Sequence, residues 1–331
     1  MSSEILRLDC DNLVIGAGLA GLVAALRLTG TTIVASAGMG ATAISGGVLS
    51  SPCRDPDVDQ WFLSTMKASD CRYTEGRCLT DLMAAKAGMI QESMDFGEEQ
   101  PVPVSLDGTT PAQGMALDIP RFRGRSCTEI ARILDTDDTA VDLLSAALKN
   151  VEASAILLPP VLGITRASEV RSSVENNSGT RVFEYVTAPS IHGMRLLGAL
   201  RKLAGSRKAI TVLDMSRVDR IKGAIRGRMG TKGKREFTVS ASKLILATGG
   251  PLTGLKVDGD RVIEPLTGHV VGDVSSDFDF RFLADHPIMY RGIGQKPGVS
   301  ATCKDVRAAG AVSVGYGLYE ALRTGYYAGA L

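Results

Sequence analysis

Hydrophobic residues in the first forty positions change their spacing twice. Residues 12–16 have an apolar centre at residues 13–15, residues 18–29 repeat apolar positions at helical spacing, and residues 31–35 end in the apolar residues 33–35. These patterns predict a buried strand, a helix and a second buried strand. Such a strand–helix–strand unit is typical of α/β proteins whose sheet is parallel.

The middle of the chain has a helical pattern and two further strand–helix units. Residues 61–94 have helical spacing, and Ser126 with Glu129 three residues later is a capping box that predicts the start of a helix. Residues 155–173 and 184–203 each have a strand, a loop containing proline and glycine, and a helix. We expect the two strands to be parallel and each to lead into its helix.

The last third begins with strands. Residues 209–248 predict successive strands joined by an exposed turn, and residues 317–329 predict a terminal helix. Strands and helices thus alternate in most of the chain, which favours an α/β fold over an all-α or all-β fold.

Composition excludes several classes of protein. Lysine and arginine exceed aspartate and glutamate by one (37 against 36), so net charge indicates neither nucleic acid nor a membrane as partner. None of the six cysteines forms a Cys-x-x-Cys pair, so we expect no metal or iron–sulfur site in this chain and reduced thiols in the cytoplasm. The apolar run 13–28 is short for a membrane span, so any membrane contact would come through a partner.

The first turn carries the clearest candidate chemistry. Gly16, Gly18 and Gly21, with Leu19 and Ala20 between them, form a G-x-G-x-x-G motif that leaves a strand and opens a helix. The first glycine permits a tight turn, the second allows the backbone to approach a pyrophosphate, and the third lets the helix pack on the strand. The amides at the helix N-terminus then face the phosphate charge, so the motif predicts a dinucleotide site.

One position departs from the usual dinucleotide pattern. About twenty residues after the glycine turn, where an aspartate or glutamate would normally bind a ribose, this chain has Ser36. A serine hydroxyl can bind the ribose, but more weakly than a carboxylate. The cofactor could therefore lack adenosine.

Two further motifs, together with the glycine turn, extend this pattern to a family. Residues 243–250, KLILATGG, read as a strand ending in Ala-Thr-Gly, and residues 306–329 begin with a strand and an Ala-Gly turn. In this order the motifs resemble those of flavoproteins with two dinucleotide-binding domains. That resemblance implies a flavin lined by a serine–glycine loop and by both turns, at Thr42, Ser45, Gly46, Gly47, Ala247, Thr248, Gly249, Gly310, Ala311 and Val312.

Several stretches narrow the resemblance to one group. The chain is similar to the B subunit of anaerobic glycerol-3-phosphate dehydrogenase, within the fumarate reductase and succinate dehydrogenase-like flavoproteins, in the stretches ATAISGGVLS, TEIARILDTDD, AILLPPVLGI, APSIHGMRL, KLILATGG and IEPLTGHVV. This group also tends to lack the ribose acid. The resemblance implies FAD, with FMN as the alternative. The flavin would be non-covalent, because Gly40 stands where an attaching histidine would precede the loop.

The same resemblance implies a domain organisation and partners. A Rossmann-like FAD-binding domain would consist of residues 1–55 and 205–331, with residues 56–204 as an inserted α/β cap. A second flavoprotein would oxidise glycerol 3-phosphate to dihydroxyacetone phosphate, and an iron–sulfur subunit would pass electrons towards quinone. We expect a cytoplasmic subunit of such a complex, peripheral to the membrane only through a partner.

Candidate catalytic residues are few. His286 precedes the C-terminal flavin turn, and His192 lies in a strand-to-helix loop where ligands often bind. Either histidine could transfer a proton or make a structural hydrogen bond. Arg121, Arg123 and Arg125 alternate along an expected extended segment, where they could bind a small anionic substrate or form a solvated basic surface.

Four functions fit these residues. The first is a flavin-dependent dehydrogenase subunit acting on glycerol 3-phosphate. The second is a flavin relay without its own substrate, and the third is a reductase of the fumarate-reductase type. The fourth is a scaffold that binds no flavin.

Overall fold

In the computed structural model the chain divides into two compact units. The sheet unit consists of Met1–Thr42, Ser50–Thr65 and Ala199–Leu331, and the inserted unit of Ala43–Leu49 and Met66–Gly198. The structure describes residues 5–47, 49, 55–68, 103–105, 111–113, 116–153, 155–184, 191–220, 225–231, 233, 235–250, 254–273, 305–314 and 317–330.

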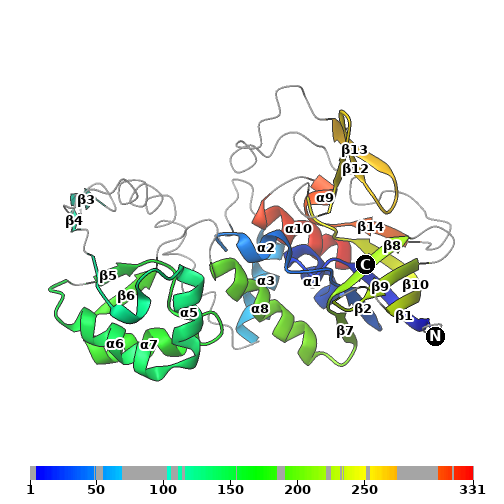
Figure 1. The fold of residues 1–331 in the computed structure, drawn as a ribbon. Coiled ribbons are helices and arrows are strands. Elements are labelled where there is room, and N and C mark those ends of the chain that lie inside the picture. The colour runs from blue at the N-terminus through cyan, green and yellow to red at the C-terminus, as the bar shows by residue number, and fades with distance from the viewer. Residues whose placement is uncertain are drawn as a thin grey trace. The chain divides into compact units, whose positions relative to one another are not determined.

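The sheet unit is built on parallel strands (Figure 1). Their order is β7-β2-β1-β10-β14, formed by Ile210–Leu213, Thr32–Ala35, Leu6–Ile15, Arg235–Leu246 and Asp305–Ala308. From β1, the first strand of the chain, the sheet grows to one side with β2 and β7 and to the other side with β10 and β14, so the direction of strand addition reverses at β1. In open α/β sheets, ligands bind at such a reversal, outside the carboxyl ends of the strands.

Strand β10 joins two kinds of sheet. Its first half pairs antiparallel with β9 (Ile225–Met229), which continues to β8 (Ser216–Arg220). Its second half pairs parallel with β14, and its other edge pairs with β1 along most of that strand. The first part of β1 accordingly alternates half-buried and exposed residues, whereas its last four residues are all buried.

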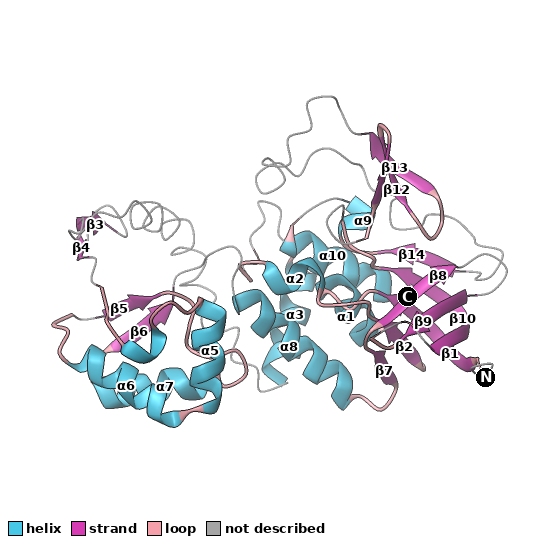
Figure 2. Cartoon of the chain, viewed as in Figure 1, coloured by secondary structure: helices cyan, strands magenta, loops and turns pink. Residues whose placement is uncertain are grey.

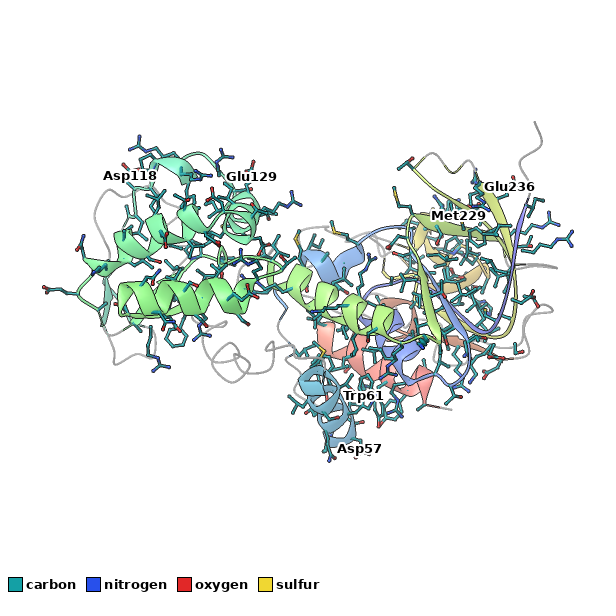
Figure 3. All side chains as sticks on the ribbon, turned by 90° about the horizontal axis from the view of Figure 1, so that it is seen from below. Asp57, Trp61, Asp118, Glu129, Met229 and Glu236 are labelled. Atoms are coloured by element: carbon teal, nitrogen blue, oxygen red, sulfur yellow. The ribbon has the colours of Figure 1, made fainter. Side chains whose placement is uncertain are left out.

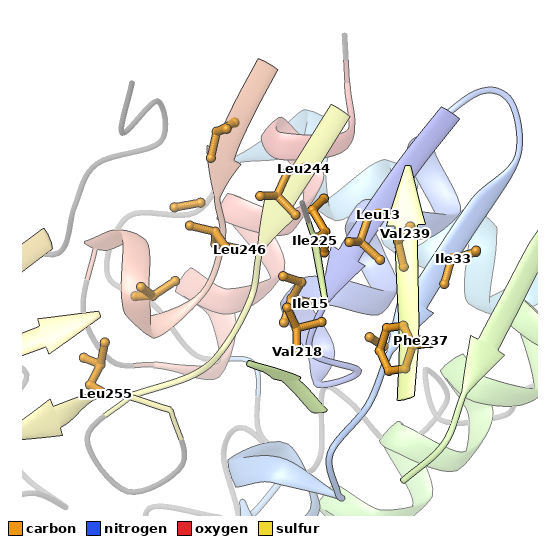
Figure 4. Close-up of a cluster of buried hydrophobic side chains, with 14 of the residues drawn as sticks. Leu13, Ile15, Ile33, Val218, Ile225, Phe237, Val239, Leu244, Leu246 and Leu255 are labelled. Atoms are coloured by element: carbon orange, nitrogen blue, oxygen red, sulfur yellow. The ribbon is translucent and has the colours of Figure 1, made fainter. Parts of the chain in front are cut away.

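Buried apolar side chains from these strands form one hydrophobic cluster (Figure 4). It includes Leu13 and Ile15 of β1, Leu244 and Leu246 of β10, and Phe237 near the start of β10. The continuous apolar runs that predicted buried strands therefore form the core, and the predicted parallel α/β sheet is confirmed.

Helices pack closely beside this sheet (Figure 2). They are α1 (Leu19–Arg27), α9 (Ala311–Val314) and α10 (Leu318–Gly329). Helix α3 (Pro56–Ala68) contacts α10 through Trp61 and Tyr326, and α2 (Gly40–Ile44) is a short helix that follows β2. A Cβ on Gly325 or Gly329 of α10 would lie 2.4 Å from the carbonyl oxygen of Ala20 or 2.5 Å from that of Ala24. The backbones of α1 and α10 can therefore touch only because these positions are glycines.

In the described part of the inserted unit, three complete helices lie beside a short parallel pair of strands. These are α5 (Cys127–Thr136), α6 (Asp138–Lys149), α7 (Ala167–Ser178), β5 (Ala155–Leu158) and β6 (Arg181–Glu184). The predicted capping box at the start of α5 is confirmed, with the Ser126 side chain accepting from the Glu129 amide and the Glu129 side chain accepting from the Ser126 amide. The parallel pairing of β5 with β6 confirms the prediction of two parallel strand–helix units.

The remaining elements are small or span the two units. Helix α8 (Ile191–Ser206) begins in the inserted unit and ends in the sheet unit. The others are β3 (Pro103–Ser105), β4 (Pro111–Gln113), β11 (Lys256–Asp258), β12 (Arg261–Glu264), β13 (His269–Asp273) and a short 3₁₀ turn at Pro120–Phe122. No helix within the described ranges is long and apolar enough to cross a membrane.

Candidate functional site

The glycine turn after β1 is held against the end of β10. Gly16 has a φ of +114°, and a Cβ there would lie 2.0 Å from the carbonyl oxygen of Ala247. A Cβ on Gly21 would lie 1.9 Å from the carbonyl oxygen of Gly16. Both positions must therefore be glycine because backbone occupies the space a side chain would need.

Gly18 has a different environment. It is the N-cap residue of α1, with no side-chain cap, and a Cβ there would meet only the Thr42 Oγ1 atom, at 3.3 Å. The Leu19 amide donates to Thr42 Oγ1 at 3.0 Å, and the first i→i−4 bond of the helix is from Leu22 to Gly18. The amides of Ala20 and Gly21 precede that bond, so they can face an anion.

The other two turns of the predicted site lie beside the first. The Gly310 amide donates to Thr324 Oγ1 at 2.7 Å, and a Cβ on Gly310 would lie 3.0 Å from the Ala20 Cβ. The turn that leads into Ala311 and Val312 therefore touches α1, as Ala247 touches Gly16. Turns that are far apart in sequence meet at the carboxyl ends of β1, β10 and β14.

Two buried hydroxyls at these turns fit a polar ligand. Thr248 Oγ1, beside Gly249, and Ser313 Oγ, beside Val312, are buried and have no hydrogen-bond partner among the described residues. Buried polar atoms are normally paired, and a bound polar ligand could pair these two atoms. The cradle and these hydroxyls fit a dinucleotide cofactor.

Ser36, at the end of β2, is buried and fully engaged. Its hydroxyl lies 3.1 Å from the Gly38 carbonyl oxygen, to which it donates, and accepts from Arg201 Nη2 at 3.0 Å. Its side chain therefore has a packing role in this structure, and binding of a ribose by Ser36 stays a prediction.

The serine–glycine loop belongs to the inserted unit. The Ser45 hydroxyl accepts from the Gly47 amide at 3.3 Å, and the Ser45 carbonyl oxygen accepts from the Gly193 amide at 3.2 Å. The loop that contains Gly46 thus lies against the start of α8, next to His192. Two predicted site regions, one for cofactor and one for catalysis, meet here.

A buried charge cluster surrounds His192. Arg195 forms two hydrogen bonds with Glu184, one of them Nη2 to Oε1 at 3.1 Å, and donates from Nε to the Gly163 carbonyl oxygen at 2.7 Å. The side chains of Arg195 and Glu184 are only 13% and 9% exposed. The Leu162 amide also donates to Glu184, at 2.7 Å.

This environment sets the charge of Glu184 and the tautomer of His192. Burial alone would raise the pKa of Glu184, but the charge and hydrogen bonds of Arg195, together with the hydrogen bond from the Leu162 amide, lower it below its usual value. Arg195 Nη1 lies 3.3 Å from His192 Nδ1. Because a guanidinium can only donate, Nδ1 must accept, and the proton of a neutral His192 then sits on Nε2.

The predicted arginine cluster is arranged differently from the expectation. Arg121 lies in the 3₁₀ turn, so the prediction of an extended segment is wrong; Pro120 at the start and Gly124, with a φ of +67°, bend the chain. Figure 3 labels Asp118, which forms an ion pair with Arg123. That hydrogen-bonded pair lowers the pKa of Asp118.

The three guanidinium groups therefore have separate partners. Arg121 pairs with Asp137, and Arg125 donates to the Arg121 carbonyl oxygen at 3.0 Å. His286, the other catalytic candidate, lies outside the described residues. Among the described residues no group of three or more His, Cys, Asp and Glu side chains could hold a metal ion.

Sequence reasoning did not find Glu184 and Arg195. A signal was present, because Arg195 follows His192 by three positions on a predicted helix and must share its face. Glu184, at the end of its strand, could not be assigned to that face without the fold.

The parallel sheet and its glycine turns define a dinucleotide-binding α/β protein. Residues 11–276 match the FAD binding domain family. The chain belongs to this family, so it is a flavoprotein, and the predicted FAD cofactor and Rossmann-like fold are confirmed. No curated protein matches the chain.

Solved structures similar to this chain include two reductases and a dehydrogenase. A flavocytochrome c3 fumarate reductase is 15% identical over 73% of this chain and 34% of its own, with a TM-score of 0.29. A quinol fumarate reductase of E. coli is 14% identical over 74% of this chain and 33% of its own, with a TM-score of 0.30. The 3-ketosteroid delta1-dehydrogenase of Sterolibacterium denitrificans is 16% identical over 73% of this chain and 48% of its own, with a TM-score of 0.29. The chain spans between a third and a half of the length of these proteins.

Proposed function

We propose that this chain is a FAD-dependent oxidoreductase subunit similar to the B subunit of anaerobic glycerol-3-phosphate dehydrogenase. The observation that carries the proposal is the meeting of the three turns at Gly16, Ala247 and Gly310, which builds a cofactor cradle from distant segments. Residues 1–55 and 205–331 are proposed as its FAD-binding domain, and residues 56–204 as its cap.

The chain's own residues would hold the cofactor without a covalent bond. Backbone at Gly18 and the amides of Ala20 and Gly21 would bind the pyrophosphate. The hydroxyls of Thr248 and Ser313 would supply hydrogen bonds that they lack within the described residues. Bound FAD would supply the two-electron chemistry, and the protein would hold the cofactor in place.

His192 is proposed to contact the substrate. Arg195 fixes its Nδ1 as an acceptor, and Glu184 fixes Arg195, so a neutral His192 carries its proton on Nε2. A small anionic substrate would receive that hydrogen bond on an oxygen atom. In this tautomer His192 donates and does not act as a base.

That tautomer favours a second candidate function. A reductase of the fumarate-reductase type needs a proton donor, whereas oxidation of an alcohol needs a base. A relay without its own substrate needs neither. As the resemblance to the glycerol-3-phosphate dehydrogenase B subunit implies, we propose that electrons would pass to an iron–sulfur subunit of a complex that also has a second flavoprotein.

A spectroscopic experiment separates these functions. The purified full chain should be yellow, and anaerobic glycerol 3-phosphate should bleach its flavin while glycerol does not. Bleaching that requires the partner flavoprotein would instead support the relay, and reoxidation of dithionite-reduced flavin by fumarate would support the reductase. A chain that stays colourless with added FAD contradicts the proposal.

A matched pair of variants tests His192. His192→Gln should slow the flavin reaction about a hundredfold, the lower range for a proton donor, without loss of bound FAD. His269→Gln, at an exposed position of β13, is the control and should leave the rate unchanged. Equal rates in both variants would remove His192 from the mechanism.

A further inference from the structure

The carboxyl edge of β2 is shared with a neighbouring strand. Strands β2 and β7 are parallel, and their register pairs Ala35 with Leu213. The next residues, Ser36 and Asp214, therefore leave the sheet at the same edge. A hydrogen bond of 2.9 Å from the Ser36 amide to the Leu213 carbonyl oxygen continues the pairing to that point.

Ser36 is closed off from a ligand at this edge. The residue is 1% exposed, its hydroxyl donates to the Gly38 carbonyl oxygen, and the hydroxyl oxygen accepts from Arg201 Nη2. Its amide also donates to Ser216 Oγ, at 3.2 Å. A ribose would have to displace Arg201 to reach it.

Asp214 presents what Ser36 lacks. Its Oδ1 accepts from Arg201 Nη1 at 3.0 Å, and the side chain is 61% exposed. Arg201 is the only described residue that forms a hydrogen bond with this side chain, and the bond uses Oδ1. Arg201 holds the carboxylate with the same guanidinium that covers Ser36.

We propose that Asp214 binds the adenosine ribose of FAD, replacing from β7 the acid that is missing at the end of β2. Arg201 is the positioning residue. Both ribose hydroxyls can donate to one carboxylate, which is a stronger acceptor than a serine hydroxyl. The negative charge of Asp214 also disfavours a phosphate on that ribose, so the site selects an unmodified adenosine. The inference rests on the proposed FAD-binding function.

Nucleotide fragments test the contact independently of flavin chemistry. ADP and 2′-deoxy-ADP would be titrated against FAD fluorescence quenching in the full chain. Loss of one hydrogen bond to a charged group corresponds to about a tenfold change in affinity, so 2′-deoxy-ADP should bind about tenfold more weakly than ADP. Asp214→Asn should reduce that preference to less than about threefold and weaken FAD binding about tenfold.

Asp138→Asn is the matched control. Asp138 is also an exposed aspartate whose Oδ1 accepts from an arginine Nη1, that of Arg166 at 3.2 Å, but it lies in the inserted unit. This variant should keep the full preference for ADP. Asp214→Ser is a second variant with the same expectation as Asp214→Asn, should the latter not fold.

The outcomes are distinguishable. Equal affinity of the unaltered chain for ADP and 2′-deoxy-ADP overturns the role of Asp214, as does a preference that persists in both Asp214 variants. A chain that binds neither FAD nor ADP overturns the proposed function and this inference together. A chain that binds FAD but does not distinguish the two fragments overturns this inference alone.

Discussion

The two units build their candidate sites from different materials. In the sheet unit the site is backbone, since Gly16 and Gly21 bring main-chain segments to distances that a side chain would prevent. In the inserted unit the site is side chain, since Glu184 and Arg195 are buried together around His192. An added side-chain atom should disrupt the glycine turns, whereas removal of a charge should disrupt the cluster around His192.

This difference separates recognition from chemistry. A backbone cradle binds phosphate through amides and carries no sequence-dependent charge, so it suits a cofactor with a fixed shape. A buried charge pair fixes the orientation and proton position of a neighbouring side chain, which suits a reacting substrate. The first assignment can be tested by adding a methyl group at a glycine, and the second by removing a buried charge.

Removal of Glu184 should have the largest effect on stability. Glu184→Ala leaves Arg195 buried without its carboxylate, and breaking such a pair costs about 3–5 kcal/mol. Urea denaturation should show this loss in the free energy of unfolding. Glu169→Ala is the control, because Glu169 pairs with Arg166 in the same unit but is 69% exposed. A similar result for both variants would contradict the importance of burial.

The acid stability of the protein should depend on the same residue. Because the pKa of Glu184 is lowered in the folded chain, its contribution is present above the ordinary carboxyl pKa and is lost as pH falls through the lowered value. Glu184→Gln should therefore show a shallower loss of stability in acid than the unaltered chain. Parallel stability curves would show that Glu184 keeps an ordinary pKa.

Added methyl groups should break the cradle in a graded way. Gly16→Ala forces an alanine to a φ of +114° and places its Cβ 2.0 Å from the Ala247 oxygen. Strain and overpacking together should cost about 3 kcal/mol, measured by thermal unfolding. FAD should be lost with the fold of the turn.

Two neighbouring glycines provide matched controls. Gly18→Ala meets only Thr42 Oγ1 at 3.3 Å, so it should weaken FAD binding while changing stability little. Gly38→Ala enters open space with nothing within 4 Å, so it should change neither property. Equal loss of stability at positions 16 and 18 would contradict the distinction between a structural and a ligand-facing glycine.

The sequence predicted the backbone site better than the side-chain site. Glycine positions, apolar runs and the Ala-Thr-Gly strand are local signals, and they sufficed for the parallel sheet and the family. The side-chain contacts join segments that only the fold brings together. They are those of Arg195 with Glu184 and those of Arg201 with Ser36 and Asp214. The arginines at 121–125 were misjudged because a local turn overrode their alternate spacing.

A titration of Tyr327 should show how a hydrogen bond to a carboxylate changes the pKa of a phenol that is not deeply buried. The Tyr327 hydroxyl donates to Asp55, which raises the pKa of Tyr327 to about 12. Because the folded pKa is raised, the stabilisation is complete below about pH 10 and is lost as pH rises towards 12. Near-ultraviolet absorbance should show a late-titrating phenol that Tyr327→Phe removes and Asp55→Asn shifts to lower pH. Unchanged titration in Asp55→Asn would contradict the assigned cause.

The smallest effect should come from Arg123, a charge pair of the inserted unit that lies in solvent. The side chains of Arg123 and Asp118 are 66% and 65% exposed, so water screens their attraction. Arg123→Ala should leave the melting temperature unchanged, in contrast to Glu184→Ala, while the pKa of Asp118 returns towards its ordinary value. The double variant Arg123→Ala, Arg125→Ala then tests substrate binding without a stability effect. Weaker binding of glycerol 3-phosphate in that variant would support the predicted arginine clamp, whereas unchanged affinity would leave the buried cluster at His192 as the substrate site.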